Sequence, residues 1–246
     1  MGQAVAMVSG KGGTGKTSLT ALLGVSLAVL GRRTLLLDCD LGLRDLDLAL
    51  GMTDRAVMDF SDVMAGSVTL EDAVSRHERL ESLYLLTAPL RLDQEHVTED
   101  AMGSLLDRVR EEFDFCLIDG GAGLGDSFRL ATSHADRAVV VSTTEPACLR
   151  DAQRTVMEME SFPPGRLHLV VNRVRKRLLR TLRSNIDDAM DAAGLPLLGV
   201  VPEDEDLSAL MAKGRADRFG YFSPARRAAV NIARRLCGEK VPIMKV

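Results

Sequence analysis

The fold is decided near the start of the chain, where residues 4–18 read AVAMVSGKGGTGKTS. The first six of these residues form a run that predicts a buried strand, and the next eight match the pattern G-x-x-x-x-G-K-T. Glycines let such a loop turn tightly and direct backbone N–H groups inward, and a following helix adds the positive end of its dipole. The stretch therefore predicts a strand, a polyphosphate-binding loop and a helix.

The loop supplies the candidate phosphate contacts. They are Gly10, Lys11, Gly12, Gly13, Thr14, Gly15, Lys16, Thr17 and Ser18. We expect Lys16 to reach the β- and γ-phosphate oxygens and the Thr17 hydroxyl to ligate Mg²⁺.

Short apolar runs alternate with helical periodicity along the rest of the chain, as in a parallel sheet covered on both faces. The expected strands are 4–9, 34–38, 83–87, 115–119, 138–142, 167–172 and 197–201. The expected helices are 16–30, 99–112, 146–161, 178–193 and 224–237. We therefore predict an α/β fold with a doubly wound, mostly parallel sheet, and a single domain over 1–246.

Composition excludes several other classes of protein. With 246 residues, 46% hydrophobic and 27% charged, the chain is too apolar for a disordered protein and long enough for a sizeable core. Its 4 cysteines form no CxxC pair, which indicates buried thiols in a reducing compartment. The start lacks the features of a signal peptide, and the longest apolar stretch, 19–30, is too short to span a bilayer. We expect a cytoplasmic protein.

Carboxylates end two of the expected strands. Asp38 and Asp40 follow the second strand beside the phosphate loop, where a doubly wound sheet places its ligand. Asp119 closes the apolar run 115–119 in a Walker B pattern and is expected to hold Mg²⁺ through water. Asp45 and Asp47 are better explained as residues of a helix N-terminus.

The segment KGGTGKT, with its additional Lys11, resembles the deviant Walker A signature of the MinD/ParA family of ATPases. This resemblance implies that ATP and Mg²⁺ are the cofactors. It also implies that Lys11 crosses a dimer interface to the partner's nucleotide, so that ATP binding and homodimerisation are one event. The catalytic residues would then be Lys11, Lys16 and Asp40. Asp40 would orient the attacking water, and Asp38 would support the Mg²⁺ shell with Thr17, Asp40 and Asp119.

The resemblance extends over nearly the whole chain. Asn172 and Arg173 match the family's base-recognition strand end, and Pro202, Glu203 and Asp204 match its turn against the base and ribose. The string from 42 to 47, GLRDLD, is more like the MinD branch than the ParA branch. The implied function is a slow ATPase, stimulated by a regulatory protein, that acts in the spatial control of cell division.

One position departs from the family pattern. Gly121 stands in the second switch, where relatives usually carry a proline. Because glycine lacks the fixed φ of proline, we expect a turn here that is more mobile without nucleotide.

Two stretches concentrate positive charge although the net charge is -4. Residues 173–183 contain six basic residues and no acid, and 213–245 contain nine basic residues and two acids. They could bind DNA or anionic lipid, or form a solvated face balanced by Asp187, Asp188 and Asp191. Residues 240–246 are too short, and contain a proline, to form an amphipathic membrane anchor. Because the basic stretches could still bind anionic lipid, peripheral binding at the inner face of the cell membrane stays an alternative.

Two other functions are alternatives to an ATPase that dimerises when it binds ATP. A ParA-like protein would bind DNA without sequence preference for chromosome, plasmid or flagellar positioning. A scaffold that binds ATP without turnover would explain the altered second switch. An iron–sulfur carrier is disfavoured because the chain has no CxxC pair.

Overall fold

The computed structural model describes residues 1–41, 44–53, 55, 57–89, 96–160, 162–163, 165–182, 185–218 and 223–244. Residues 42–43 of the GLRDLD string, Arg183 of the first basic stretch and Lys245 of the second lie outside these ranges.

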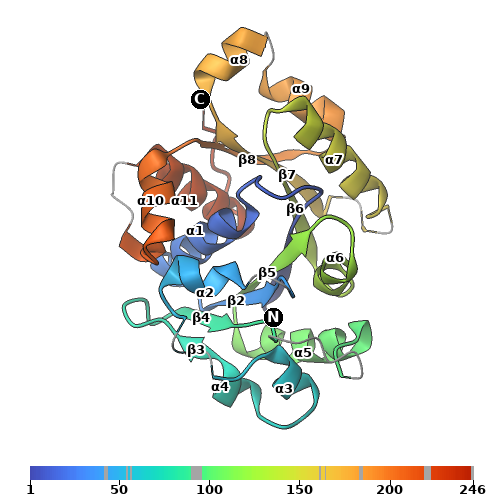
Figure 1. Ribbon diagram of the computed structural model, residues 1–246, viewed down its shortest axis with the longest axis vertical. Helices are drawn as coiled ribbons and strands as arrows, with labels where there is room; N and C mark the ends of the chain where they lie inside the picture. The colour runs from blue at the N-terminus through green and yellow to red at the C-terminus, as the bar shows by residue number, and fades with distance from the viewer. Residues whose placement is uncertain are drawn as a thin grey trace.

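One eight-stranded sheet runs through the described residues in the order β3-β4-β2-β5-β1-β6-β7-β8 (Figure 1). The strands are β1 (Gln3–Ser9), β2 (Thr34–Cys39), β3 (Ser75–Arg76), β4 (Leu83–Leu86), β5 (Phe115–Ala122), β6 (Arg137–Ser142), β7 (Leu167–Val174) and β8 (Leu197–Pro202). Neighbouring strands are parallel except at the end of the sheet, where β3 runs antiparallel to β4. This confirms the predicted α/β class with a mostly parallel sheet.

Helices cover both faces of the sheet. They are α1 (Lys16–Val29), α2 (Asp45–Leu50), α3 (Phe60–Met64), α4 (Leu70–Ala73), α5 (Glu99–Glu112), α6 (Asp126–Thr132), α7 (Pro146–Met157), α8 (Lys176–Leu182), α9 (Ile186–Ala193), α10 (Glu205–Ala212), the short 3₁₀ helix η1 (Ala216–Arg218) and α11 (Pro224–Leu236). On one face lie α1, α2, α10, η1 and α11, and on the other α3, α5, α6, α7 and α9 (Figure 1).

The central strand β1 shows why the sequence forms this layered core. Val5 and Met7 pack into the core beneath α1 and α11, whereas Ala4, Ala6 and Val8 pack into the cores on the opposite face. Successive strand residues point to opposite faces, so a strand with helices on both sides must be apolar throughout. All five side chains are fully buried.

The prediction of one continuous helix over 178–193 is wrong. The structure has two helices here, because Asn185 begins α9 with a capping box. The Asn185 side chain accepts from the Asp188 N–H (3.0 Å), and the Asp188 carboxylate accepts from the Asn185 N–H (2.8 Å). These bonds satisfy N–H groups that would be unpaired at a new helix start.

The prediction of buried thiols is confirmed for three of the four cysteines, and Cys237 is half-buried. All four thiols are free, and Cys39, Cys116 and Cys148 are buried. Among the described helices, none has both the length and the apolar character that crossing a membrane requires.

Candidate nucleotide site

The phosphate-binding loop connects β1 to α1 at the centre of the sheet (Figure 1). Gly15 precedes the helix with φ 79°, a left-handed conformation that glycine adopts without strain. No side chain among the described residues caps α1. Its first N–H groups are thus left for an anion, and the helix dipole favours negative charge at the same place.

A buried ion pair lies beneath this loop. The Lys16 ammonium lies 2.7 Å from Asp119 Oδ1, with side-chain exposures of 6% and 1%. Thr20 Oγ1 donates to the same carboxylate oxygen (2.9 Å). The other oxygen, Asp119 Oδ2, is buried and has no hydrogen-bond partner in the described part of the chain. The site therefore retains an unused acceptor next to the loop.

Asp38 adds a second buried carboxyl to the same place. It accepts hydrogen bonds from the backbone N–H of Asp40 (2.9 Å) and of Leu46 (3.3 Å). Burial, reinforced by the Asp119 carboxylate, raises the pKa of Asp38 from 3.8 to about 7. One ammonium thus faces more carboxylate charge than it can neutralise, and a cation would be stabilised here.

Mg²⁺ fits this donor set. It commonly binds one or two carboxylates together with waters and substrate phosphates rather than a cage of protein ligands. No group of three His, Cys, Asp or Glu side chains able to hold a metal occurs within the described ranges. Asp119 Oδ2 is available to accept from a metal-bound water, and Thr17 is the second residue of α1.

The second switch differs from the expected turn. Gly121 lies within β5, which continues to Ala122 and pairs there with Ser9 of β1. The left-handed turn comes only at Gly123, with φ 84°. A Cβ atom at position 121 would lie 2.7 Å from Ser127 Cβ and 3.9 Å from Asp40 Oδ1. The β1–β5 register shifts between Met7 and Ser9, so Gly121 lies at an irregularity of this pairing, where glycine leaves space beside Ser127.

The predicted base-site residues line a common cavity of about 190 Å³. Its polar wall contains Gly15, Ser18, Asn172, Arg173, Pro202, Glu203 and Asp204. Its apolar wall contains Leu19, Leu22, Val201, Leu207 and Met211. Leu207 and Met211 were not predicted from the sequence, although Asp204, which caps α10, is a residue type that signals a following helix.

Two of these residues also hold the phosphate-binding loop. Asn172 Nδ2 donates to the Thr14 carbonyl (2.9 Å), and Arg173 Nη1 donates to the Gly13 carbonyl (3.0 Å). The end of β7 is thereby fastened to the loop at the end of β1. The loop and the cavity form one site.

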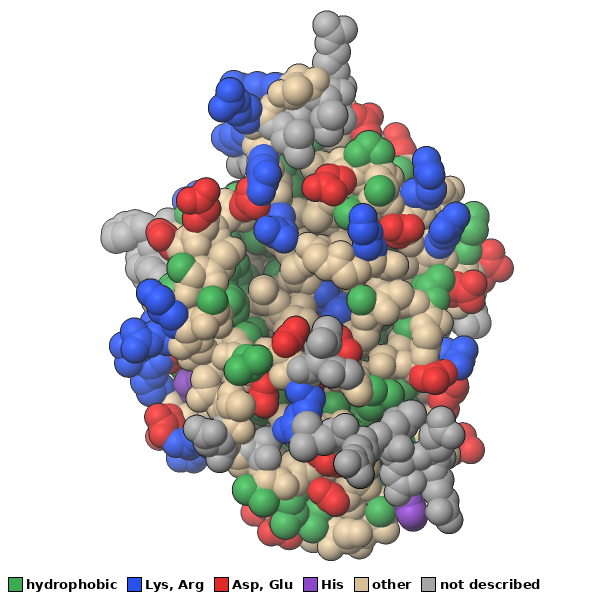
Figure 2. Space-filling view, viewed as in Figure 1, with side chains coloured by type: hydrophobic (Ala, Val, Ile, Leu, Met, Phe, Trp, Pro, Cys, Tyr) green, Lys and Arg blue, Asp and Glu red, His purple; other side chains and the backbone are tan. Residues whose placement is uncertain are grey.

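The first basic stretch divides into two groups. Arg173 and Arg175 both pair with Glu203, and the hydrogen bond from Arg175 lowers the pKa of this carboxyl. Lys176, Arg177 and Arg180 lie exposed on α8, where Figure 2 shows basic side chains at the top of the view. None of these three forms an ion pair with a described residue, so balance by the acids of α9 is not observed as contacts.

Comparisons with known proteins identify the family. The family model described as "CobQ/CobB/MinD/ParA nucleotide binding domain" matches residues 5–216. The septum site-determining protein MinD of Synechocystis is 36% identical over 246 residues, which are 99% of this chain and 92% of that protein.

Two solved structures are similar over nearly their whole length. A MinC:MinD cell division protein complex from Aquifex aeolicus contains a chain with a TM-score of 0.88 and 32% identity, covering 99% of this chain and 98% of that one. MinD from Pyrococcus horikoshii, complexed with Mg-ADP, has a TM-score of 0.81 and 32% identity, covering 96% of each chain.

Proposed function

Because the chain belongs to the MinD branch of the CobQ/CobB/MinD/ParA nucleotide-binding family, we propose that ATP and Mg²⁺ bind at its phosphate loop and control pairing of two copies. The chain is an ATPase that acts in the spatial control of cell division. One observation carries the proposal: the buried Lys16–Asp119 pair lies between an uncapped helix N-terminus and a second buried carboxyl. We further propose that residues 1–246 work as one domain, since one sheet runs through them.

Binding a triphosphate would rearrange this ion pair. The N–H groups of residues 10–18 surround the phosphates, and Lys16 moves from Asp119 to their β- and γ-oxygens. Asp119 and Thr17 would hold Mg²⁺, Asp119 through a water molecule and Thr17 through its hydroxyl group. When bound, Mg²⁺ neutralises charge that develops on the phosphate oxygens.

Hydrolysis would depend on Asp40. Its backbone N–H is held by Asp38 Oδ1 at 2.9 Å, which fixes the chain where β2 ends. Its carboxylate orients the attacking water, and catalysis rests on positioning and charge neutralisation. Asp40→Ala should therefore abolish phosphate release; a scaffold that binds ATP without turnover would show none in the unaltered protein either.

Base recognition belongs to the cavity of about 190 Å³ beside the loop. Leu207 and Met211 offer an apolar wall to an adenine ring, and Asn172, Arg173, Pro202, Glu203 and Asp204 surround its polar edge and the ribose. Asn172 both fastens the loop and faces this cavity, so base binding and loop geometry are linked.

Lys11 would couple nucleotide binding to dimerisation. It is exposed on the protomer, at the loop where the phosphates bind. An ammonium group reaching the triphosphate of a second copy gains a counter-ion that hydrolysis removes. ATP would thus favour the dimer, and ADP the monomer.

The test measures molar mass by light scattering with ATP, with ADP and without nucleotide. Lys11→Ala should keep nucleotide binding and lose the ATP-dependent dimer. Lys240→Ala is the matched control, because this lysine is also exposed and lies far along the sequence. If Lys11→Ala still dimerises with ATP to the same extent, Lys11 has no part in the interface.

A regulatory protein and a polyanion complete the proposed partners. A relative is solved in complex with MinC, so we propose that a MinC-like protein binds this chain and that a partner stimulates its ATPase. The three exposed basic residues of α8 form no ion pair with any described acidic residue. They therefore favour binding to an anionic surface, either DNA or the inner face of the membrane. Binding to duplex DNA and to anionic vesicles, each measured against salt, separates these two.

A further inference from the structure

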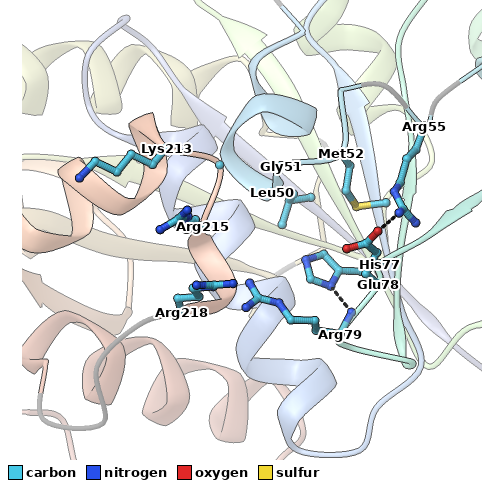
Figure 3. A pocket seen from close by; sticks show the side chains of 11 residues that line it. Leu50, Gly51, Met52, Arg55, His77, Glu78, Arg79, Lys213, Arg215 and Arg218 are labelled. Atoms are coloured by element: carbon cyan, nitrogen blue, oxygen red, sulfur yellow. Dashed lines mark hydrogen bonds and ion pairs between the residues drawn. The ribbon is translucent and has the colours of Figure 1, made fainter.

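A second, strongly basic hollow lies away from the nucleotide site. This basic pocket has a volume of about 310 Å³ and is formed by the end of α2, the loop between β3 and β4, and the segment from the end of α10 to η1 (Figure 3). Its cations are Arg55, Arg79, Lys213, Arg215 and Arg218. It shares no lining residue with the cavity beside the phosphate loop.

The pocket is firmly built where its two walls meet. A Cβ atom on Gly51 would lie 2.4 Å from the Gly214 carbonyl oxygen, and both glycines have positive φ, 68° and 61°. Only glycine at both positions allows this contact between backbones. On the β3–β4 side, His77 is 5% exposed, and its Nδ1 accepts from the Arg79 N–H (3.2 Å).

The charges in the pocket do not balance. Arg55 pairs with Glu78, and Arg79 pairs with the buried Asp217. Lys213, Arg215 and Arg218 are exposed and form no ion pair with any residue that the structure describes. Figure 2 shows basic side chains gathered at the left edge of the molecule, below α10.

Two like charges face each other across this hollow. The side chains of Arg79 and Arg218 point toward one another in Figure 3. Asp217 offsets the charge of Arg79, but Lys213, Arg215 and Arg218 have no such partner among the described residues. Repulsion among these cations is stronger in a concave site than on an open surface, because less water screens it. The dipole of α10 accounts for Lys213 at its C-terminus, but it accounts neither for Arg79, on another segment, nor for Arg218. An anion bound in the hollow would reduce the repulsion among the unpaired cations.

Two helices connect the basic pocket with the nucleotide site. The Leu46 N–H in the first turn of α2 donates to Asp38 (3.3 Å), and Leu50 at the end of α2 lines the basic pocket. Likewise Leu207 and Met211 of α10 line the nucleotide cavity, and Lys213 follows that helix in the basic pocket. A shift of either helix would therefore move residues that line both sites.

We propose that the basic pocket binds a phosphate or diphosphate group of a small molecule, and that its occupation changes nucleotide affinity. The volume is at the lower end of the range of about 300–1,000 Å³ for ligand pockets, which suits a diphosphate and part of its carrier. Arg79 and Arg218 hold the phosphate oxygens by charge-assisted hydrogen bonds, with Lys213 and Arg215 at the rim. Phosphate binding in this pocket does not depend on the function proposed for the phosphate loop, whereas the coupling rests on nucleotide binding there.

The test follows backbone amide resonances by NMR while inorganic pyrophosphate is added to protein saturated with ADP. Shifts at Gly51 and Gly214 report the basic pocket, and shifts at Gly13 and Gly15 report the phosphate loop. We expect saturable shifts at the first pair. Lys213→Ala/Arg218→Ala should weaken that binding by about tenfold or more, which corresponds to about 1.4 kcal/mol.

The matched control is Arg108→Ala/Arg154→Ala, which removes the same charge from exposed positions on α5 and α7 and should leave pyrophosphate affinity nearly unchanged. Equal weakening in both double variants, or no shift at Gly51 and Gly214, overturns the site. An ADP affinity that pyrophosphate leaves unchanged overturns the coupling, because such coupling is reciprocal.

Further titrations identify the source of the phosphate. If vesicles of a phosphomonoester lipid shift the Gly51 and Gly214 resonances in the same way as pyrophosphate, the phosphate group belongs to a lipid headgroup. Pyrophosphate binding without any effect of these vesicles assigns it to a soluble molecule. Duplex DNA that displaces pyrophosphate, and needs Lys213 and Arg218 equally, overturns the small-ligand proposal in favour of a nucleic-acid surface.

Discussion

Replacing Asp38 by Asn should stabilise the nucleotide-free protein at pH 8 and have almost no effect at pH 5. The Asp38 carboxyl is buried beside Asp119, and its pKa is raised from 3.8 to about 7. As pH rises, the unfolded chain loses this proton near pH 4, whereas the folded protein keeps it until near pH 7. The free energy of unfolding therefore falls across this window and stays low above it.

The magnitude follows from the size of the shift. A rise from 3.8 to about 7 is worth about 4 kcal/mol at ~1.4 kcal/mol per pKa unit. Asn cannot ionise, so it removes the free-energy cost of a buried carboxylate. It also lacks the second oxygen, which accepts from the Leu46 N–H, and this lost hydrogen bond lowers stability by about 1 kcal/mol. We expect a net stabilisation of about 3 kcal/mol at pH 8 and under ~1 kcal/mol at pH 5, where most of the cost has disappeared.

Urea unfolding in EDTA without nucleotide measures this difference at both pH values. Asp187→Asn serves as the control, because this carboxylate is exposed on α9. A stability difference between Asp38→Asn and the unaltered protein that is the same at pH 5 and pH 8 would refute the assignment of a buried, protonated carboxyl.

Three further changes test other parts of the structure. Lys16→Ala leaves Asp119 buried without its cation, so it should cost about 3–5 kcal/mol in urea unfolding and abolish ATP binding in calorimetry; an unchanged stability contradicts the pair. Ser223→Ala removes the cap that accepts from the Arg226 N–H and should lower stability by about 1 kcal/mol, whereas Ser223→Asn should largely restore it. Ile232→Ala in the fully buried face of α11 should cost about 2–5 kcal/mol; a loss below ~1 kcal/mol would mean that this face is not packed as described.

The sequence predicted the sheet well because its strands are buried on both faces. Uninterrupted apolar runs mark such strands, and the carboxyl ends of β1, β2 and β5 carry the motifs that identify the nucleotide site. The predicted base-site residues lie in one cavity for the same reason, since parallel strands end at the same edge.

Competition between alternative backbone hydrogen-bond partners explains two differences between the predicted and the observed elements. The helical periodicity over 178–193 did not reveal that Asn185 and Asp188 would cap each other and begin a new helix. Gly121 suggested a free turn, but pairing with β1 extends β5 past it. Such outcomes depend on which backbone partner is available, which periodicity does not report.

Long-range contacts explain the rest. Lys16 and Asp119 are 103 residues apart, and their pairing in the absence of a phosphate follows only from the fold. The basic pocket joins cations from residues 55–79 with cations from 213–218, so the sequence showed only the second group, as part of a charged stretch. The tight contact of Gly51 with Gly214 has no sequence signal beyond the two glycines themselves.

The two-residue strand β3 has a consequence for how copies of this protein associate. Ser75 and Arg76 close the sheet in the antiparallel sense, and Arg76 is exposed there. Long, flat edges recruit further strands and seed aggregates, whereas a short edge carrying charge offers little to extend. Growth into fibres from this end of the sheet is therefore discouraged.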